Sequence, residues 1–276
     1  MSPASHRRIA AVLALGGAAA LGALGVATAR HRVHTHRLRR SLRARGPPDG
    51  RFDPESVADL PPPARRYLRH AIAPRRPLAR SVALELTGSF RGEGQTDWSP
   101  IAARQVLSPG RGFVWEARLS LAPGVWLSGA DWYADGRGGQ RFALLGLLPV
   151  VRASGPAVSR SAAGRLLGES VFLPAALLPG SGAEWDAVDD RRARVALSVD
   201  DLTTTLTLVV AESGALRRVE FDRPWAEGGT RPFRVAVDRE QTVAGFTVPA
   251  TIRAGWGRAG DYREFYRVDV SHVVFR

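Results

Sequence analysis

From Ser81 to the end of the chain, apolar and polar residues alternate with a period of two, the pattern of half-buried β-strands. Residues 81–90 show this pattern most simply, with four apolar side chains on one face: Val82, Leu84, Leu86 and Phe90. Similar short runs follow, separated by the turn signals Pro109-Gly110, Asp135-Gly136 and Ser213-Gly214. The pattern predicts about eleven strands in a β-dominated α+β body.

A helical period interrupts the strands in SRSAAGRLLGESVFLPAALLP, residues 159–179. Its apolar stripe consists of Ala162, Leu166, Leu167 and Val171, so this segment is expected to form the one helix that covers the sheet. Upstream of the strands, Pro54 to Leu60 predicts a short helix. A second helix is expected to begin at Pro61 to Pro63 and to end before Pro74.

An uninterrupted apolar stretch, Ile9 to Ala29, contains 21 residues and no charge. A helix of that length spans about 30 Å, the thickness of the hydrocarbon core of a bilayer. It predicts an N-terminal transmembrane helix. The alternative is a cleaved secretory signal ending at Ala27-Thr28-Ala29. The expected organisation is a membrane anchor with a basic arm in residues 1–45, a Pro-rich linker with short helices in 46–80, and a β-rich domain in 81–276.

Positive charge is concentrated beside this stretch. Residues 1–80 hold 16 of the 39 basic residues and 4 of the 26 acidic ones, a net charge of +12 out of +13 for the chain. The basic arm consists of Arg30, Arg32, Arg37, Arg39, Arg40, Arg43 and Arg45. It predicts binding to anionic lipid headgroups and a single-pass location in a bacterial cell membrane. The positive-inside rule favours a cytoplasmic arm, but a neutral β-rich body suits either side, so the side stays open.

Several function classes are disfavoured by residue types. Nucleic acid is not an expected partner, because no aromatic or base-reading side chains lie among the arginines of the arm. The absence of cysteine excludes disulfides and thiolate chemistry. No histidine lies between residues 71 and 271, which argues against a Ser-His-Asp hydrolase. The histidines of the arm have no neighbouring carboxylate or cysteine to complete a shell, so neither a metal nor another cofactor is expected.

Paired carboxylates are the catalytic chemistry that the body could supply. The candidates are Asp131, Asp135, Glu169, Asp186, Asp189 and Asp190. Their spacing favours structural roles, and Glu169 is expected to pair with Arg165 one helical turn away. A cation site formed by Asp186, Asp189 and Asp190 is the alternative interpretation of that cluster.

Aromatic residues are the candidates for ligand binding. Trp115, Trp126 and Trp132, with the adjacent Tyr133, fall in consecutive predicted strands. If their side chains share the concave face of a curved sheet, they line an apolar ligand cavity. The alternative is that they fill the core, as large aromatic residues usually do.

Several motifs occur in the order found in a known bacterial family: PPPARRYL (residues 61–68), GFVWEA (112–117), GRLLGESVFLPAALLP (164–179) and PFR (232–234). Over roughly residues 58–275 the chain resembles this family of unknown function, whose members often carry an N-terminal membrane segment. That family is in turn similar to the LolA-like lipoprotein carriers. The similarity implies a curved antiparallel half-barrel around an apolar cavity capped by helices. The chain departs from the family pattern at Phe172, where the E-x-x-W-x-P region leads one to expect a Trp two residues before Pro174.

Two function classes follow. In the first, a membrane-tethered half-barrel binds a lipid or another hydrophobic ligand without enzymatic chemistry. In the second, the sheet is fully packed and the domain is an envelope interaction or structural module. An apolar cavity above about 300 Å³ favours the first class and a filled interior favours the second. A carboxylate-based hydrolase is the third alternative.

Overall fold

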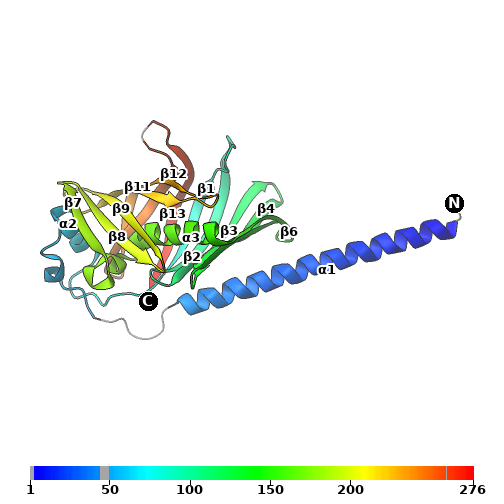
Figure 1. The fold of residues 1–276 in the computed structure, drawn as a ribbon, viewed down its shortest axis with the longest axis horizontal. Helices are drawn as coiled ribbons and strands as arrows, with labels where there is room; N and C mark the ends of the chain where they lie inside the picture. The colour runs from blue at the N-terminus through cyan, green and yellow to red at the C-terminus, as the bar shows by residue number, and fades with distance from the viewer. Residues whose placement is uncertain (1–2, 44–49, 259) are drawn as a thin grey trace.

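The computed structural model describes residues 3–43, 50–258 and 260–276, with side chains of the first helix described at residue 22 and from residue 24 onward. In these residues the body is one sheet of 13 antiparallel strands in the order β6-β5-β4-β3-β2-β1-β13-β12-β11-β10-β9-β8-β7 (Figure 1). The strands are β1 (Val82–Phe90), β2 (Ser99–Ser108), β3 (Gly112–Ala122), β4 (Val125–Ala134), β5 (Arg137–Leu144), β6 (Leu148–Ser154), β7 (Glu184–Asp189), β8 (Arg192–Val199), β9 (Leu202–Val210), β10 (Leu216–Pro224), β11 (Thr230–Val243), β12 (Phe246–Trp256) and β13 (Arg263–Phe275).

The first and last strands pair in the middle of the sheet, so that β6 and β7 form its two edges. Between these edges in sequence lie α3 (Pro156–Gly168) and the short 3₁₀ turns η2 (Glu169–Phe172), η3 (Pro174–Leu177) and η4 (Pro179–Ser181). Helix α3 lies across one face of the sheet (Figure 1), which we call the inner face. Its Leu166 and Leu167 are buried in one core with inward-pointing strand residues such as Leu84 and Phe113. The predicted covering helix is therefore confirmed over the first part of 159–179.

The open sheet has more strands than the sequence predicted, 13 against about eleven. The two strands that the alternation missed are β6 and β7. Most side chains on both edges are exposed. Because no buried face imposes a period of two on them, hydrophobic alternation could not reveal them.

The two helices predicted upstream of the sheet are confirmed as η1 (Pro54–Val57) and α2 (Pro62–Ala71). Asp53 caps η1 by accepting a hydrogen bond from the backbone N–H of Glu55 at 3.0 Å. Proline begins α2, where its missing N–H has no helical partner to lose. The buried side of α2 carries Tyr67 and Leu68, which join the same core as α3.

Helix α1 (Pro3–Leu42) extends away from the body at its N-terminal end and meets the opposite, outer face of the sheet at its C-terminal end (Figure 1). There Leu42 packs with Val106 and Val114 in a small apolar cluster. The His34 ring contacts Trp132 edge-on, with 4.9 Å between ring centroids. The inner and outer faces of β2 to β4 therefore carry separate apolar clusters.

The structure does not bear out a transmembrane helix in the residues that it describes. Among the residues that the structure describes, no helix is long and apolar enough to cross a membrane. Within the predicted span Ile9 to Ala29, the side chains of residues 9–21 and of residue 23 lie outside the described part of the chain.

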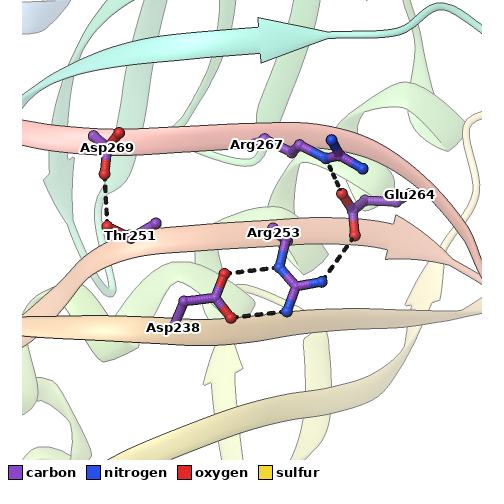
Figure 2. A network of polar contacts seen from close by, with 6 residues as sticks. All are labelled: Asp238, Thr251, Arg253, Glu264, Arg267 and Asp269. Atoms are coloured by element: carbon purple, nitrogen blue, oxygen red, sulfur yellow. Dashed lines mark hydrogen bonds and ion pairs between the residues drawn. The ribbon is translucent and has the colours of Figure 1, made fainter.

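Ion pairs connect the outward-facing side of β11, β12 and β13 (Figure 2). Arg253 donates two hydrogen bonds to Asp238, at 2.7 and 2.8 Å, and approaches Glu264 at 3.5 Å. Glu264 also accepts a hydrogen bond from Arg267. The side chains of Arg253 and Asp238 are 45% and 40% exposed, so this pair contributes at most about 1 kcal/mol to stability.

Candidate functional site

A groove of about 950 Å³ lies between α1 and the outer face of the sheet. Its wall on the helix side includes Val33, His36 and Arg40. Its floor is built from small side chains of β1, β2, β4 and β5: Thr87, Ala102, Ser128, Ala130 and Ala143. Because these side chains are short, the sheet leaves an open trough beside the helix, and most of the floor is apolar.

Positive charge dominates the lining of this groove. Six arginines line it: Arg32, Arg37, Arg40, Arg104, Arg118 and Arg141. Two carboxylates, Glu85 and Glu116, accompany them, which leaves a net charge of +4 with the histidines neutral. Such an excess attracts anions and repels cations within the Debye length of about 10 Å at 0.1 M salt.

Polar contacts at two points hold α1 against the sheet beside the groove. Glu116 of β3 lies 3.4 Å from Arg39 of α1 and accepts a hydrogen bond from Arg104 of β2 at 2.8 Å. Farther along the helix, Arg141 of β5 donates to the backbone carbonyl of Ala27 at 2.6 Å. Burial, followed by the charge of Arg141, lowers the pKa of His31 in the groove wall to about 4, so this imidazole is neutral at pH 7.

A second polar cluster lies on the inner face beneath α3. Arg165 of α3 donates to Glu169 at 2.8 Å and to Asp131 of β4 at 2.9 Å. Its guanidinium also stacks over Phe113 and Trp115, 4.9 and 4.8 Å from the ring centroids. The Arg165–Glu169 pair confirms the one-turn spacing predicted from the sequence.

Burial perturbs the charged groups of this inner cluster. Desolvation raises the pKa of Asp131, although Arg165 and Arg223 act in the opposite direction. Desolvation, followed by the charge of Arg165, lowers the pKa of Arg223 to about 10. A cavity of about 20 Å³ adjoins Asp131, Arg165 and Arg223. It is large enough for about one water molecule and far smaller than a sugar.

The four aromatic residues predicted to bind a ligand are divided between the two faces. Trp115 and Tyr133 are buried on the inner face, 6% and 3% exposed, and belong to the main core. Trp132 packs against the outer-face cluster with α1, and Trp126 lies beneath the guanidinium of Arg118 at 4.2 Å. These residues do not line one shared cavity, because neighbouring positions of β4 point to opposite sides of the sheet.

The arginines of the predicted basic arm have different surroundings. Arg32, Arg37 and Arg40 line the groove, and Arg39 pairs with Glu116. Arg30 and Arg43 are exposed to solvent, and Arg45 lies outside the described residues. Much of the arm therefore faces the protein's own sheet.

One member of the predicted acidic cluster, Asp189, caps the turn that follows β7. Asp189 accepts hydrogen bonds from the backbone N–H groups of Arg191 and Arg192, at 2.9 and 2.8 Å. In the part of the chain that the structure describes, no group of three or more His, Cys, Asp or Glu residues is arranged to hold a metal ion.

Most of the chain matches a known protein family. The model of a family of unknown function, DUF6544, matches residues 50–268. The chain belongs to the DUF6544 family. The match covers α2, α3 and nearly all of the sheet, but the wall of the groove formed by α1 lies outside it. A comparison with curated protein sequences finds no match.

This DUF6544 chain is similar in structure to a LolA superfamily protein from Nitrosomonas europaea, with 10% sequence identity and a TM-score of 0.42 over 78% of this chain and 92% of that chain. It is also similar to a DUF1329 family protein from Desulfovibrio piger, with 12% identity and a TM-score of 0.35 over 71% of this chain and 86% of that chain. Of the resemblance expected from the sequence, membership of a family of unknown function is confirmed.

Sequence reasoning missed the groove of this DUF6544 chain. Arg118 and Arg141 belong to strands that were predicted, but their role depends on α1 folding back along the outer face. The sequence contains one signal of such packing. Glu116 is an isolated acid on the outer face of β3, and the basic arm supplies its partner Arg39.

Proposed function

We propose that this chain is a non-enzymatic binding protein for an anionic amphiphile, held in the groove between α1 and the outer face of the sheet. The observation that carries the proposal is the groove itself, whose volume of about 950 Å³ lies within the range of known ligand sites. Its apolar floor suits a hydrocarbon chain. Its arginines suit a carboxylate, phosphate or sulfonate headgroup.

This proposal moves the hydrophobic ligand from the interior of the sheet to its outer face. On the inner face, side chains from α2, α3 and the 3₁₀ turns form one continuous core with the strands. The inner cluster adjoins a cavity of only about 20 Å³. That packing supports the second candidate function, an interaction or structural module. The carboxylate chemistry of a hydrolase is supported less well, because Asp131 and Glu169 are both bound to Arg165.

Blocking the floor of the groove provides a direct test. Thr87 is exposed on the outer face of β1 and pairs with Ala102 of β2. In Thr87→Trp the indole would fill the trough without entering the core. We expect affinity for the anionic dye ANS, with oleate as competitor, to fall at least tenfold, or about 1.4 kcal/mol. Fluorescence titration of the full chain measures this change.

The matched control is Thr205→Trp. Thr205 is an exposed threonine of β9 that pairs with Ala196 of β8, far from the groove lining. We expect this variant to bind ANS and oleate as the parent chain does. If both variants bind equally well, or if the parent chain binds neither compound, the groove is not an amphiphile site and the interaction module becomes the better candidate.

We also propose that the N-terminal segment associates the chain with a bacterial membrane. The support is the uncharged stretch from Ile9 to Ala29, followed by the arginines of the arm. In the full chain, Leu13→Arg combined with Leu21→Arg should move the protein from the membrane fraction to the supernatant after cell lysis. The control replaces both residues with isoleucine. If the arginine variant still sediments with membranes, this segment is not responsible for association.

A further inference from the structure

The turn between β5 and β6 is apolar, although exposed turns are normally rich in polar residues and glycine. Residues 144–149 read Leu-Leu-Gly-Leu-Leu-Pro. Leu145, Leu147 and Leu148 are 41%, 48% and 48% exposed. Leu145 also adopts a left-handed conformation, with φ 52°, which costs a non-glycine residue stability. The turn therefore exposes leucines to solvent in spite of an unfavourable backbone conformation.

The neighbouring turn between β3 and β4 extends this surface. The backbone N–H of Leu145 donates to the carbonyl of Trp126 at 2.8 Å, so the two turns lie side by side. Leu121 and Val125 are 49% and 37% exposed at the second turn. We call the combined surface the apolar tip: Leu121, Val125, Leu145, Leu147, Leu148 and Val150.

Basic and aromatic side chains border the apolar tip. Arg118 lies over the ring of Trp126 at 4.2 Å. The guanidinium of Arg32 reaches Gly146, where an added Cβ would lie 3.3 Å from its Nη2 atom. The chain contains no Asp or Glu from Arg137 to Gly168. Leucines bordered by tryptophan and arginine, in a segment without acidic residues, match the chemistry of an anionic lipid surface.

The course of α1 favours a lipid surface over a protein partner. Arg141 binds the carbonyl of Ala27. The uncharged stretch that ends at Ala29 therefore leaves the body beside the hairpins of β3 to β6 (Figure 1). The apolar tip and the uncharged stretch of α1 thus occur at the same end of the molecule. A lipid bilayer accommodates both, whereas a protein partner would have to match each separately.

We propose that the apolar tip inserts into the interfacial region of an anionic bilayer. Leu145, Leu147 and Leu148 enter the boundary between headgroups and acyl chains, while Arg32 and Arg118 contact the headgroup phosphates. Gly146 lies between Leu145 and Leu147 of the tip and also lines the groove, so one end of the groove opens toward the lipid. Insertion does not depend on whether the groove binds an amphiphile, so each proposal can fail without the other.

The absence of cysteine from this chain permits a site-specific test. Leu147→Cys in the full chain is labelled with the environment-sensitive fluorophore NBD and mixed with vesicles of phosphatidylcholine and phosphatidylglycerol. We expect a blue shift and about a twofold or greater rise in emission, because the label leaves water for the bilayer interface. The effect should be weaker with pure phosphatidylcholine vesicles, since the arginines then lack anionic partners.

The matched control is Thr96→Cys, an exposed position in the polar turn between β1 and β2. Its label should keep the emission that it has in water. A second label at Leu121→Cys tests the neighbouring turn if the first variant folds poorly. The label reports the hairpin itself, even if residues 1–45 tether the chain to the vesicle. No change at either apolar position, or an equal change at Thr96, would overturn the proposal.

Discussion

Replacing Arg165 with methionine should destabilise the protein by about 3 kcal/mol. Arg165 is the shared partner of Asp131 and Glu169, and its side chain is only 14% exposed. Removing one member of a buried ion pair leaves an uncompensated buried charge and costs about 3–5 kcal/mol. We expect the lower end of that range because Glu169 retains 24% exposure and gains some solvation. Urea denaturation of the full chain measures the loss.

The penalty should also depend on pH. Burial already raises the pKa of Asp131, and removing the Arg165 charge raises it further. A carboxyl with a raised folded-state pKa binds protons more tightly in the folded than in the unfolded chain. Protonation of Asp131 therefore stabilises the folded state most below the unfolded pKa of about 3.9. This stabilisation is lost as pH rises through the folded-state pKa. The Arg165→Met variant should accordingly recover part of its lost stability in mildly acidic buffer.

The control for Arg165 is Arg253→Met on the outward-facing side of β12. Arg253 also contacts two carboxylates, Asp238 and Glu264, but its side chain is 45% exposed (Figure 2). We expect a loss below about 1 kcal/mol, because water replaces the lost contacts. Equal losses in the free energy of unfolding of the two variants would mean that the ion pairs of Arg165 stabilise the fold no more than the exposed pairs of Arg253.

The sequence predicted the parts of the fold that have one buried and one solvated face. In β1, Leu84 and Leu86 point into the core while Glu85 and Thr87 are exposed, so the alternation is complete. The stripe on residues 159–179 predicted α3 for the same reason, because Leu166 and Leu167 face the sheet. Edge strands β6 and β7 lack such a face. Their existence follows from pairing with β5 and β8, which a local pattern does not contain.

The groove could not be predicted because it forms between segments far apart in sequence. Its wall comes from residues 28–40 of α1, and its floor comes mainly from strands β1 to β5. Trp115 also points to the opposite face of the sheet from Trp126 and Trp132. Trp115 of β3 pairs with Asp131 of β4, and the adjacent Trp132 therefore points to the other face of the sheet. Paired residues share a face, so the register of β3 and β4 decides it.

Two glycines on the inner face explain how these strands bend together. A Cβ added to Gly88 of β1 would overlap the carbonyl oxygen of Arg267 in β13, and one added to Gly129 of β4 would overlap that of Arg141 in β5. Both positions have the same parity as buried inner-face residues of their strands. Neighbouring strands can approach so closely only where the side chain is absent, which allows the sheet to curve around α3.

Gly88→Ala should therefore cost up to about 3 kcal/mol, the upper end of the range for overpacking, because the obstacle is backbone and not a flexible side chain. Urea denaturation measures the loss. The control is Gly180→Ala in η4, where an added Cβ meets nothing within 4 Å and the backbone is not left-handed. That control should change stability by no more than about 0.5 kcal/mol. A Gly88 variant as stable as this control would show that the curvature does not require glycine there.

Loss of curvature at Gly88 should also reach the groove. Thr87 immediately precedes Gly88 in β1. It lies on the groove floor and pairs with Ala102 of β2. If β1 and β13 separate to admit a Cβ at Gly88, the floor moves relative to α1, whose position is fixed by Glu116 and Arg141. Folded Gly88→Ala should therefore bind ANS more weakly than the parent chain, although its substitution points to the opposite face. Unchanged ANS binding by the folded variant would mean that the groove depends on its local side chains alone and not on the bend of the sheet.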